Sequence, residues 1–231
     1  MRAATRVSKE FRRPSLRAAM LQTFVRTAGA VTLVHALLAV PTARAADPPI
    51  VVRVYDMASD GATARADALH EAAQALASAS VAVDWRDCSR GGAFHPCRTV
   101  RDQGDLVVRI MRTRMPSGDE LGFAAVDPSG RATVIATVYY DVVRRVAGRT
   151  GLDEHVLLGR AIAHEIGHLL LRAPGHADSG LMRPLWTDAE LAANRPADWV
   201  FTDGESRQLQ AGTREPETSA VGAGNGLDAG R

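Results

Sequence analysis

A single apolar segment constrains the fold of this chain more than any other part of its sequence. Residues 150–175, TGLDEHVLLGRAIAHEIGHLLLRAPG, carry leucine, isoleucine and alanine at the three- and four-residue spacing of a helix. Thr150 and Asp153 are suitable N-terminal caps, and Pro174 with Gly175 is typical of a helix end. We therefore expect one long helix here, buried in the core of a domain.

Two histidines and a glutamate interrupt the apolar surface of this predicted helix. His164 and His168 are four residues apart, so a helix places both imidazoles on one face, where they can bind the same ion. Neutral imidazole is a ligand that zinc prefers. Glu165 lies beside the pair and can accept a proton from water, the role of a general base in hydrolysis. The alternative is that the three side chains are only hydrogen-bonded within a packing helix.

A catalytic zinc site needs a third protein ligand, and the sequence offers three candidates. His176 is favoured, because the Pro-Gly pair before it can turn the chain back beneath the helix. Asp178 has suitable chemistry but lies farther round the turn, and Glu190 requires a later helix to complete the site. His176 is therefore the predicted third ligand, with Asp178 as the alternative.

The segments outside this helix alternate between strand and helix patterns. Residues 121–141 hold two strand patterns separated by Asp127-Pro128-Ser129-Gly130, a turn signal that predicts a hairpin. Residues 46–210 are expected to form a single α+β domain, and residues 211–231, which lack apolar periodicity, a disordered tail. The other expected elements are strands over 48–58, 81–85 and 105–114, an alanine-rich helix over 62–80 and a short helix over 203–210.

Residues 1–45 have the composition of a secretory signal peptide. A basic opening is followed by an apolar stretch from Thr27 to Val40 and by small residues that end at Ala45. An uncleaved membrane anchor is disfavoured, because a span needs about 20 apolar residues and Arg26 interrupts any longer window. We expect cleavage after Ala45, no stable membrane insertion afterwards, and a protein exported to the periplasm or secreted.

Removal of the leader changes the charge of the protein. Residues 1–46 carry eight of the 28 Lys and Arg residues and one of the 26 Asp and Glu residues. The remainder has 20 basic and 25 acidic groups, a net charge near −5, whereas the whole chain is formally +2. Nucleic-acid binding depends on an excess of basic groups. We therefore expect no nucleic-acid partner.

Cys88 and Cys97 flank a glycine-containing loop. Two cysteines in an exported protein are expected to form a disulfide bond, which would close this loop. The alternative is a metal site formed by both cysteines and His95, but the segment lacks the paired close spacings of zinc-thiolate sites.

The motif and the residues after it resemble those of the metzincin clan of zinc endopeptidases. The clan's pattern is His-Glu-x-x-His-x-x-Gly-x-x-His, followed by a tight turn that holds a methionine beneath the metal. Residues 164–184 read HEIGHLLLRAPGHADSGLMRP, so the resemblance gives Met182 that place, although a methionine can also simply fill core space. The segment is also similar to uncharacterised exported bacterial proteins in which a tryptophan follows, as Trp186 does here.

The resemblance implies a fold, a cofactor and a substrate class. The fold is an α+β domain with a mostly parallel twisted sheet, an antiparallel edge strand, a packing helix, an active-site helix and a C-terminal helix. The cofactor is Zn²⁺, and the substrate is a peptide or protein. Two positions depart from the pattern: Leu171 replaces the clan's glycine and Pro174 its third histidine, so His176 comes two residues late. We expect the helix to run one or two residues longer and Pro174-Gly175 to make the turn.

These patterns together favour an exported zinc endopeptidase with Glu165 as its general base. A substrate is expected to lie extended along the edge strand around residues 122–126, GFAAV. One alternative is a periplasmic or secreted zinc-binding protein without proteolytic activity, in which the altered spacing of the third ligand leaves no open position on the metal. Another is an adhesion or partner-binding module without a metal.

Overall fold

The computed structural model describes residues 47–58, 62–89, 97, 104–112, 118–126 and 134–214. All of them belong to the second of two units into which the chain divides, Met1–Arg44 and Ala45–Arg231. The predicted leader, the predicted turn at 127–130 and His95 lie outside the described residues, so the signal peptide and the export of the protein stay predictions.

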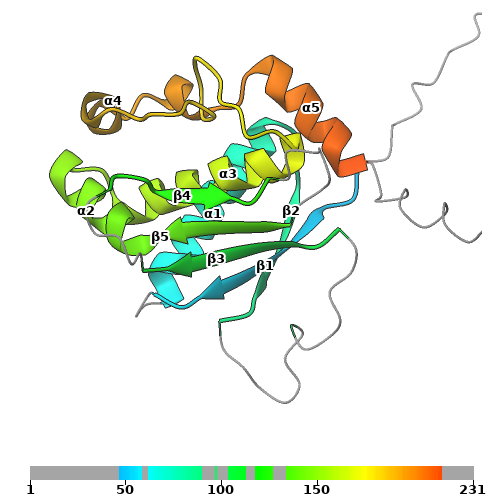
Figure 1. The fold of residues 1–231 in the computed structure, drawn as a ribbon, viewed down its shortest axis with the longest axis horizontal. Coiled ribbons are helices and arrows are strands. Elements are labelled where there is room, and N and C mark those ends of the chain that lie inside the picture. The colour runs from blue at the N-terminus through cyan, green and yellow to red at the C-terminus, as the bar shows by residue number, and fades with distance from the viewer. Residues whose placement is uncertain are drawn as a thin grey trace, which may run out of the picture. The chain divides into compact units, whose positions relative to one another are not determined.

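A five-stranded sheet of mixed direction forms the base of the domain (Figure 1). Its strand order is β2-β1-β3-β5-β4, and all neighbouring strands are parallel except β4 and β5, which pair antiparallel at the edge. The predicted mostly parallel sheet with one antiparallel edge strand is confirmed. The strands are β1 (Ile50–Asp56), β2 (Val83–Asp87), β3 (Leu106–Met111), β4 (Gly122–Ala124) and β5 (Ile135–Tyr139).

Alternating apolar residues attach this sheet to the core. In β3 the side chains of Leu106, Val108 and Ile110 are buried, and the residues between them are partly exposed. Val52 and Val54 of the neighbouring β1 are fully buried on the core side. This period of two is the pattern of a sheet with one face against helices.

The helices pack mainly around one central helix, α3. Figure 1 shows α1 and α3 side by side against the sheet, with α4 and α5 beyond α3. Gly159 of α3 allows the close approach of α1, because a Cβ atom there would lie only 2.5 Å from the Ala68 carbonyl oxygen. The helices are α1 (Ala62–Ser78), α2 (Tyr140–Thr150), α3 (Glu154–Leu171), α4 (Asp188–Ala193) and α5 (Asp203–Arg214), with a short 3-10 helix at Pro196–Trp199.

Two of these helices were missing from the sequence prediction. The α2 helix follows β5 without a break and contains Val142, Val143 and Val146, and β-branched residues favour strands. The α4 helix has only six residues, too few for a periodic signal. Its capping box, formed by Thr187 and Glu190, was the local sign that could have revealed it.

The start of the turn after α3 and the end of α5 also differ from the prediction. The α3 helix ends at Leu171, and Arg172 adopts the left-handed conformation, with φ of 51°. The turn therefore begins before Pro174-Gly175, and Gly175 does not have a positive φ. The α5 helix continues to Arg214, so the expected boundary between domain and tail at 210 falls inside it.

A disulfide bond joins Cys88 to Cys97, as predicted. Both sulfur atoms are used in this bond, so the alternative of a metal site at these cysteines is wrong. No helix in the described part of the chain is long and apolar enough to cross a membrane.

Candidate metal centre

His164 and His168 are buried neighbours on α3, with 7% and 6% of their surfaces exposed. The Nδ1 atom of His164 lies 2.8 Å from the Leu181 carbonyl oxygen, and the Nδ1 atom of His168 lies 2.9 Å from that of Ala173. A carbonyl oxygen only accepts hydrogen bonds, so each Nδ1 carries a proton and donates it. In a neutral imidazole the Nε2 atom then presents a lone pair.

The two Nε2 atoms face each other at a distance of 3.1 Å. Two lone pairs this close repel each other unless a cation binds to both. A proton is disfavoured in that place, because burial lowers the pKa of His164 to about 4 and also lowers the pKa of His168. Two nitrogens bound tetrahedrally to one zinc ion are about 3.3 Å apart. The spacing of this pair therefore fits a zinc ion.

The loop after α3 brings a third imidazole to the pair. Ligand atoms of His164, His168 and His176 all lie within 4.8 Å of one another. The His176 ring stacks against that of His164 at a centroid distance of 5.3 Å and meets that of His168 edge-on at 4.8 Å. His176 is exposed, unlike the other two. The structure thus brings together the three histidines that the sequence predicted as metal ligands.

The two other candidates for the third ligand do not join this cluster. Among the described residues, the group that could hold a metal consists of the three histidines, without Asp178 or Glu190. The Glu190 carboxylate accepts hydrogen bonds from Arg183, at 2.6 Å, and from the backbone N–H of Thr187, at 2.9 Å. Glu190 therefore caps the N-terminus of α4 and does not lie at the histidines.

The turn beneath the histidines is fixed by backbone hydrogen bonds. The Ala177 N–H donates to the Met182 carbonyl oxygen at 2.9 Å, and the Leu181 N–H donates to that of Val200 at 2.8 Å. Gly180 lies within this turn with φ of 75°, and a Cβ atom there would lie 2.5 Å from the Val200 carbonyl oxygen. Only glycine satisfies both conditions without strain. This turn also positions the Leu181 carbonyl oxygen, which binds Nδ1 of His164 and so orients its ring.

Met182 packs against the helix that carries His164 and His168. It is 1% exposed, and its sulfur lies 2.6 Å from the place of a Cβ atom on Gly167, one residue before His168. Phe201 also contacts this position, at 3.0 Å. The glycine of the motif therefore makes room for the methionine. The place beneath a metal that the resemblance gives to Met182 stays a prediction.

Glu165 is a buried carboxylate close to the edge strand. It is 6% exposed, and its Oε2 atom has no hydrogen-bond partner in the described part of the chain. Burial raises the pKa of Glu165 to about 8, with a smaller contribution from the charge of Glu120. A Cβ atom on Gly122 of β4 would lie 3.1 Å from Oε1 of Glu165 and 2.5 Å from the Thr137 carbonyl oxygen. Glycine is therefore what lets β4 pass directly over this carboxylate.

A cleft of about 540 Å³ opens at the histidines. Residues 119–124, which are β4 and the three residues before it, form one rim, and residues 183–188 form the other. Each rim carries an exposed apolar side chain, Phe123 at 39% and Leu185 at 69%. Trp186 also lines the cleft, and its ring meets that of His164 edge-on at 5.5 Å. The cleft can accommodate an apolar group beside the candidate metal centre.

The backbone of β4 offers hydrogen-bonding groups to this cleft. The Tyr139 N–H donates to the Leu121 carbonyl oxygen, and the Ala125 N–H donates to that of Ile135. In an antiparallel pair, the backbone groups of alternate residues point to opposite sides. Those of Gly122 and Ala124 therefore point away from β5, to the open edge.

The sequence identified the histidines and Glu165 but not the close approach of Gly122 to Glu165. The GFAAV segment was chosen as a substrate-binding edge, and β4 confirms that it is an edge strand. The contact between Gly122 and Glu165 has no sequence signal, because it joins two segments that meet only in the folded domain. Trp186 packs against His164 and Trp199 and also lines the cleft.

Comparison with known proteins gives a likeness in structure but none in sequence. No protein-family description matches the chain, and no curated protein matches it in sequence. Archaemetzincin from Methanopyrus kandleri has a similar solved structure, at 15% sequence identity and a TM-score of 0.45. The match covers 72% of this chain and 97% of that protein. At this level of similarity the likeness transfers neither family membership nor function.

Proposed function

We propose that this chain is a zinc-dependent peptidase in which His164, His168 and His176 hold the metal. The observation that carries the proposal is the pair of buried Nε2 atoms that face each other at 3.1 Å with both Nδ1 atoms engaged by carbonyl oxygens. Three imidazoles are a donor set that suits zinc. Three protein ligands also leave one position open, as in catalytic zinc sites.

Glu165 is the general base of the proposed reaction. Zinc held by the histidines would supply a Lewis acid that makes water more acidic and polarises a carbonyl. Glu165 accepts the proton of the attacking water and later delivers it to the leaving amine. A pKa near neutrality suits a group that must both accept and donate, and burial raises the pKa of Glu165 to about 8. Its Oε2 atom is not committed to another partner in the described structure.

The substrate is proposed to be a peptide bound in extended form along β4. The outward backbone groups of Gly122 and Ala124 can add a further strand to the sheet. Phe123 and Leu185 expose apolar surface on the two rims of the cleft. We therefore infer a preference for apolar side chains next to the cleaved bond.

The alternative of a zinc-binding protein without proteolysis is less well supported. It requires a fourth protein ligand that closes the metal site. Among the described residues no fourth histidine, cysteine, aspartate or glutamate belongs to the cluster. The cleft also opens directly at the histidines.

Removal and return of the metal tests the proposed function. The purified protein is incubated with an unfolded protein substrate, then stripped with a chelator, dialysed and titrated with zinc. We expect cleavage that disappears on stripping and returns at one zinc per chain, because the three histidines form one site. Magnesium should not restore cleavage, since it prefers oxygen ligands. A zinc-loaded protein that cleaves no peptide across a broad substrate set would contradict the proposal.

Replacement of Gly122 by Ala tests the contact between β4 and Glu165. The added methyl group would lie 2.5 Å from the Thr137 carbonyl oxygen and 3.1 Å from Oε1 of Glu165, so the strand and the base must move apart. A displacement of this size is expected to lower kcat by about 100-fold with zinc content unchanged. Gly118→Ala is the matched control, because its Cβ atom meets nothing closer than 3.9 Å. Equal kcat in both variants would rule out this contact as part of the catalytic arrangement.

A further inference from the structure

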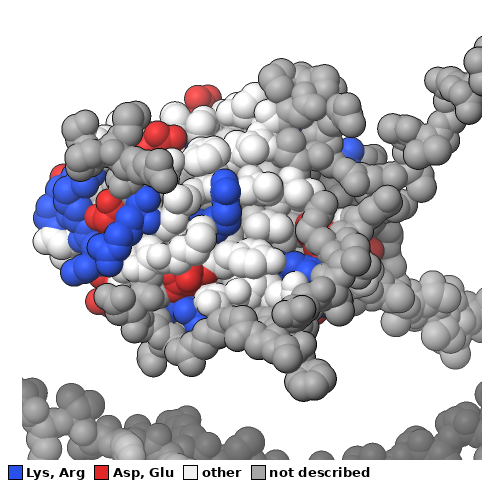
Figure 2. All heavy atoms as spheres, turned by 60° about the horizontal axis from the view of Figure 1, so that its bottom comes forward, with Lys and Arg blue, Asp and Glu red and all other residues white. Residues whose placement is uncertain are grey.

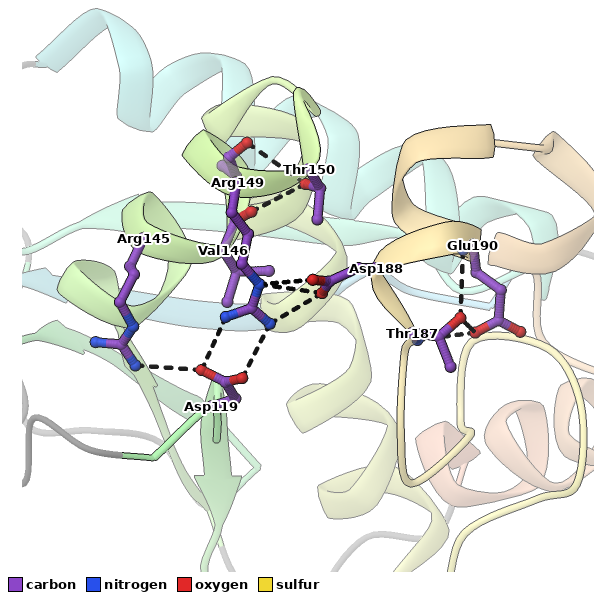
Figure 3. Close-up of polar contacts among 9 residues, drawn as sticks. Asp119, Arg145, Val146, Arg149, Thr150, Thr187, Asp188 and Glu190 are labelled. Atoms are coloured by element: carbon purple, nitrogen blue, oxygen red, sulfur yellow. Dashed lines mark hydrogen bonds and ion pairs between the residues drawn. The ribbon is translucent and has the colours of Figure 1, made fainter.

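The guanidinium of Arg149 joins the two rims at one end of the cleft. Figure 3 shows this side chain reaching from α2 to a position between Asp119 and Asp188. Its Nη1 and Nη2 atoms lie 3.1 Å and 2.9 Å from the Asp119 carboxylate oxygens. Its Nε and Nη2 atoms each lie 2.9 Å from an oxygen of Asp188. One cation therefore holds two carboxylates, and all three residues line the cleft.

Asp119 connects this cation to the edge strand. It lies three residues before β4, and the Tyr139 N–H binds the Leu121 carbonyl oxygen between them. Arg145, one turn earlier on α2, lies 3.4 Å from Asp119 and also donates to the Gly118 carbonyl oxygen. The chain that leads into β4 is thus attached to α2 by two arginines.

Asp188 connects the same cation to the opposite rim. It is the first residue of α4, directly after the Thr187 cap. Glu190, the other member of the capping box, also binds Arg183 at 2.6 Å, and Arg183 directly follows Met182. The rim formed by residues 183–188 is therefore attached at one end to the turn beneath the histidines and at the other end to Arg149.

We propose that Arg149 is a positioning residue that fixes the width of the cleft by tying the edge-strand rim to the α4 rim. The consequence for peptide binding rests on the proposed function, whereas the link between the rims does not. Without this link, β4 and the segment that carries Leu185 and Trp186 lose a side chain that binds a carboxylate from each rim. A peptide held between them then meets rims that are less firmly held at this end.

Charge and exposure make the link sensitive to salt. The side chains of Asp119, Arg149 and Asp188 are 55%, 37% and 57% exposed. The hydrogen bond from Arg149 is the main cause that lowers the pKa of Asp119 below its ordinary value. On the face in Figure 2, basic side chains gather at the end where Figure 1 places α2, with acidic side chains among them. Ion pairs this exposed weaken as salt rises.

Arg149→Met keeps most of the side-chain volume and removes the charge. Arg144→Met is the matched control, because Arg144 is also on α2 and exposed but pairs with Glu154 and does not line the cleft. Hydrogen exchange is measured at two amides, one for each rim. The Tyr139 N–H binds the Leu121 carbonyl oxygen beside Asp119, and the Leu191 N–H binds that of Thr187 beside Asp188.

The exchange measurement tests the link without any substrate. We expect both amides to exchange about fivefold faster in Arg149→Met and to be unchanged in Arg144→Met. Asp188→Asn weakens only the α4 side of the link, and we expect the Tyr139 amide, across the cleft, to exchange faster as well. Unchanged exchange in Arg149→Met, or an effect of Asp188→Asn confined to Leu191, overturns the proposal.

The kinetic measurement tests the effect on the peptide. In Arg149→Met we expect KM for a peptide to rise about fivefold, with kcat and zinc content nearly unchanged. In the wild type, KM should rise as salt increases from about 0.05 M to about 0.5 M, and this dependence should be lost in Arg149→Met. Arg149→Lys should restore part of the binding. A variant with wild-type KM and wild-type salt dependence would overturn the role in peptide binding, whereas a wild type that cleaves nothing would overturn the proposed function.

Discussion

Replacement of Glu165 by Gln is expected to reduce kcat by about 10²–10⁴-fold, the range found when a general base is removed. Glutamine has the shape of glutamate but cannot accept a proton from water. The protein should stay folded, because Oε2 of Glu165 makes no hydrogen bond in the described structure that an amide would lose. Zinc content should also be unchanged, since Glu165 is not among the three clustered ligands. Steady-state kinetics and metal analysis on the same sample check both expectations.

Glu154→Gln is the control for this variant. Glu154 begins the same helix, α3, but pairs with Tyr140 and Arg144 outside the cleft. Its replacement should leave kcat within about twofold of the wild type. If Glu165→Gln cleaved peptides as fast as Glu154→Gln, the base would have to be another group.

The same pair of variants predicts a difference in stability for the metal-free protein. Burial raises the pKa of Glu165 from 4.5 to about 8, so the folded protein holds a proton there that the unfolded chain releases. The free energy of unfolding should therefore fall as pH rises from about 4.5 to about 8. Glu165→Gln should lack this part of the pH dependence and be the more stable protein at the upper end of the window. Denaturant titrations at several pH values measure the difference.

Replacement of His176 by Ala is expected to lower zinc affinity by more than about 100-fold. Two imidazoles on α3 would remain, and two ligands hold zinc much less tightly than three. The fold itself should be unaffected, because His176 is exposed and lies in a loop. Competition with a fluorescent chelator measures the affinity, and the far-ultraviolet circular dichroism spectrum checks the fold.

Asp178→Ala is the control for the third ligand. Asp178 is the alternative from the sequence, and it lies outside the cluster of ligand atoms in the described structure. Its replacement should leave zinc affinity unchanged. The reverse outcome, with zinc lost in Asp178→Ala and retained in His176→Ala, would assign the third position to Asp178.

The sequence predicted the helical part of the site because its signal is local. The spacing of His164 and His168 specifies one face of a helix, and the apolar residues around them specify burial. The mostly parallel sheet with an antiparallel edge strand also agreed with the prediction, since the resemblance implied this layout. The helical spacing is contained in one continuous segment, and the layout of the sheet is contained in the order of segments along the chain.

The third ligand depended on a turn that the sequence did not define. Leu171, at the position where the resembled pattern has glycine, is the last residue of α3, and Arg172 takes the left-handed conformation in its place. Glycine is the usual residue for such a helix end, so the pattern favoured Gly175 instead. The helix is thus one residue longer than the resembled pattern implies. The loop between the helix and His176 is also longer, and together they account for the two extra residues before His176.

The contacts at the rims of the cleft could not be predicted, because each of them joins residues from different segments of the chain. Gly122 passes over Glu165, and Arg149 binds carboxylates from two rims. The α2 helix that carries Arg149 was itself missed, because residues 142–149 were assigned to no element and the β-branched valines in α2 do not favour a helix. Such contacts follow from the packing of the whole domain and not from local patterns.

The zinc X-ray absorption spectrum of the purified protein tests the metal centre most directly. At one zinc per chain we predict three imidazole nitrogens and one further light-atom ligand at about 2.0 Å, with no sulfur. The spectrum of His176→Ala should show one imidazole fewer. A protein that takes up no zinc, or a wild-type spectrum with four protein ligands or with sulfur, would contradict an open three-histidine site.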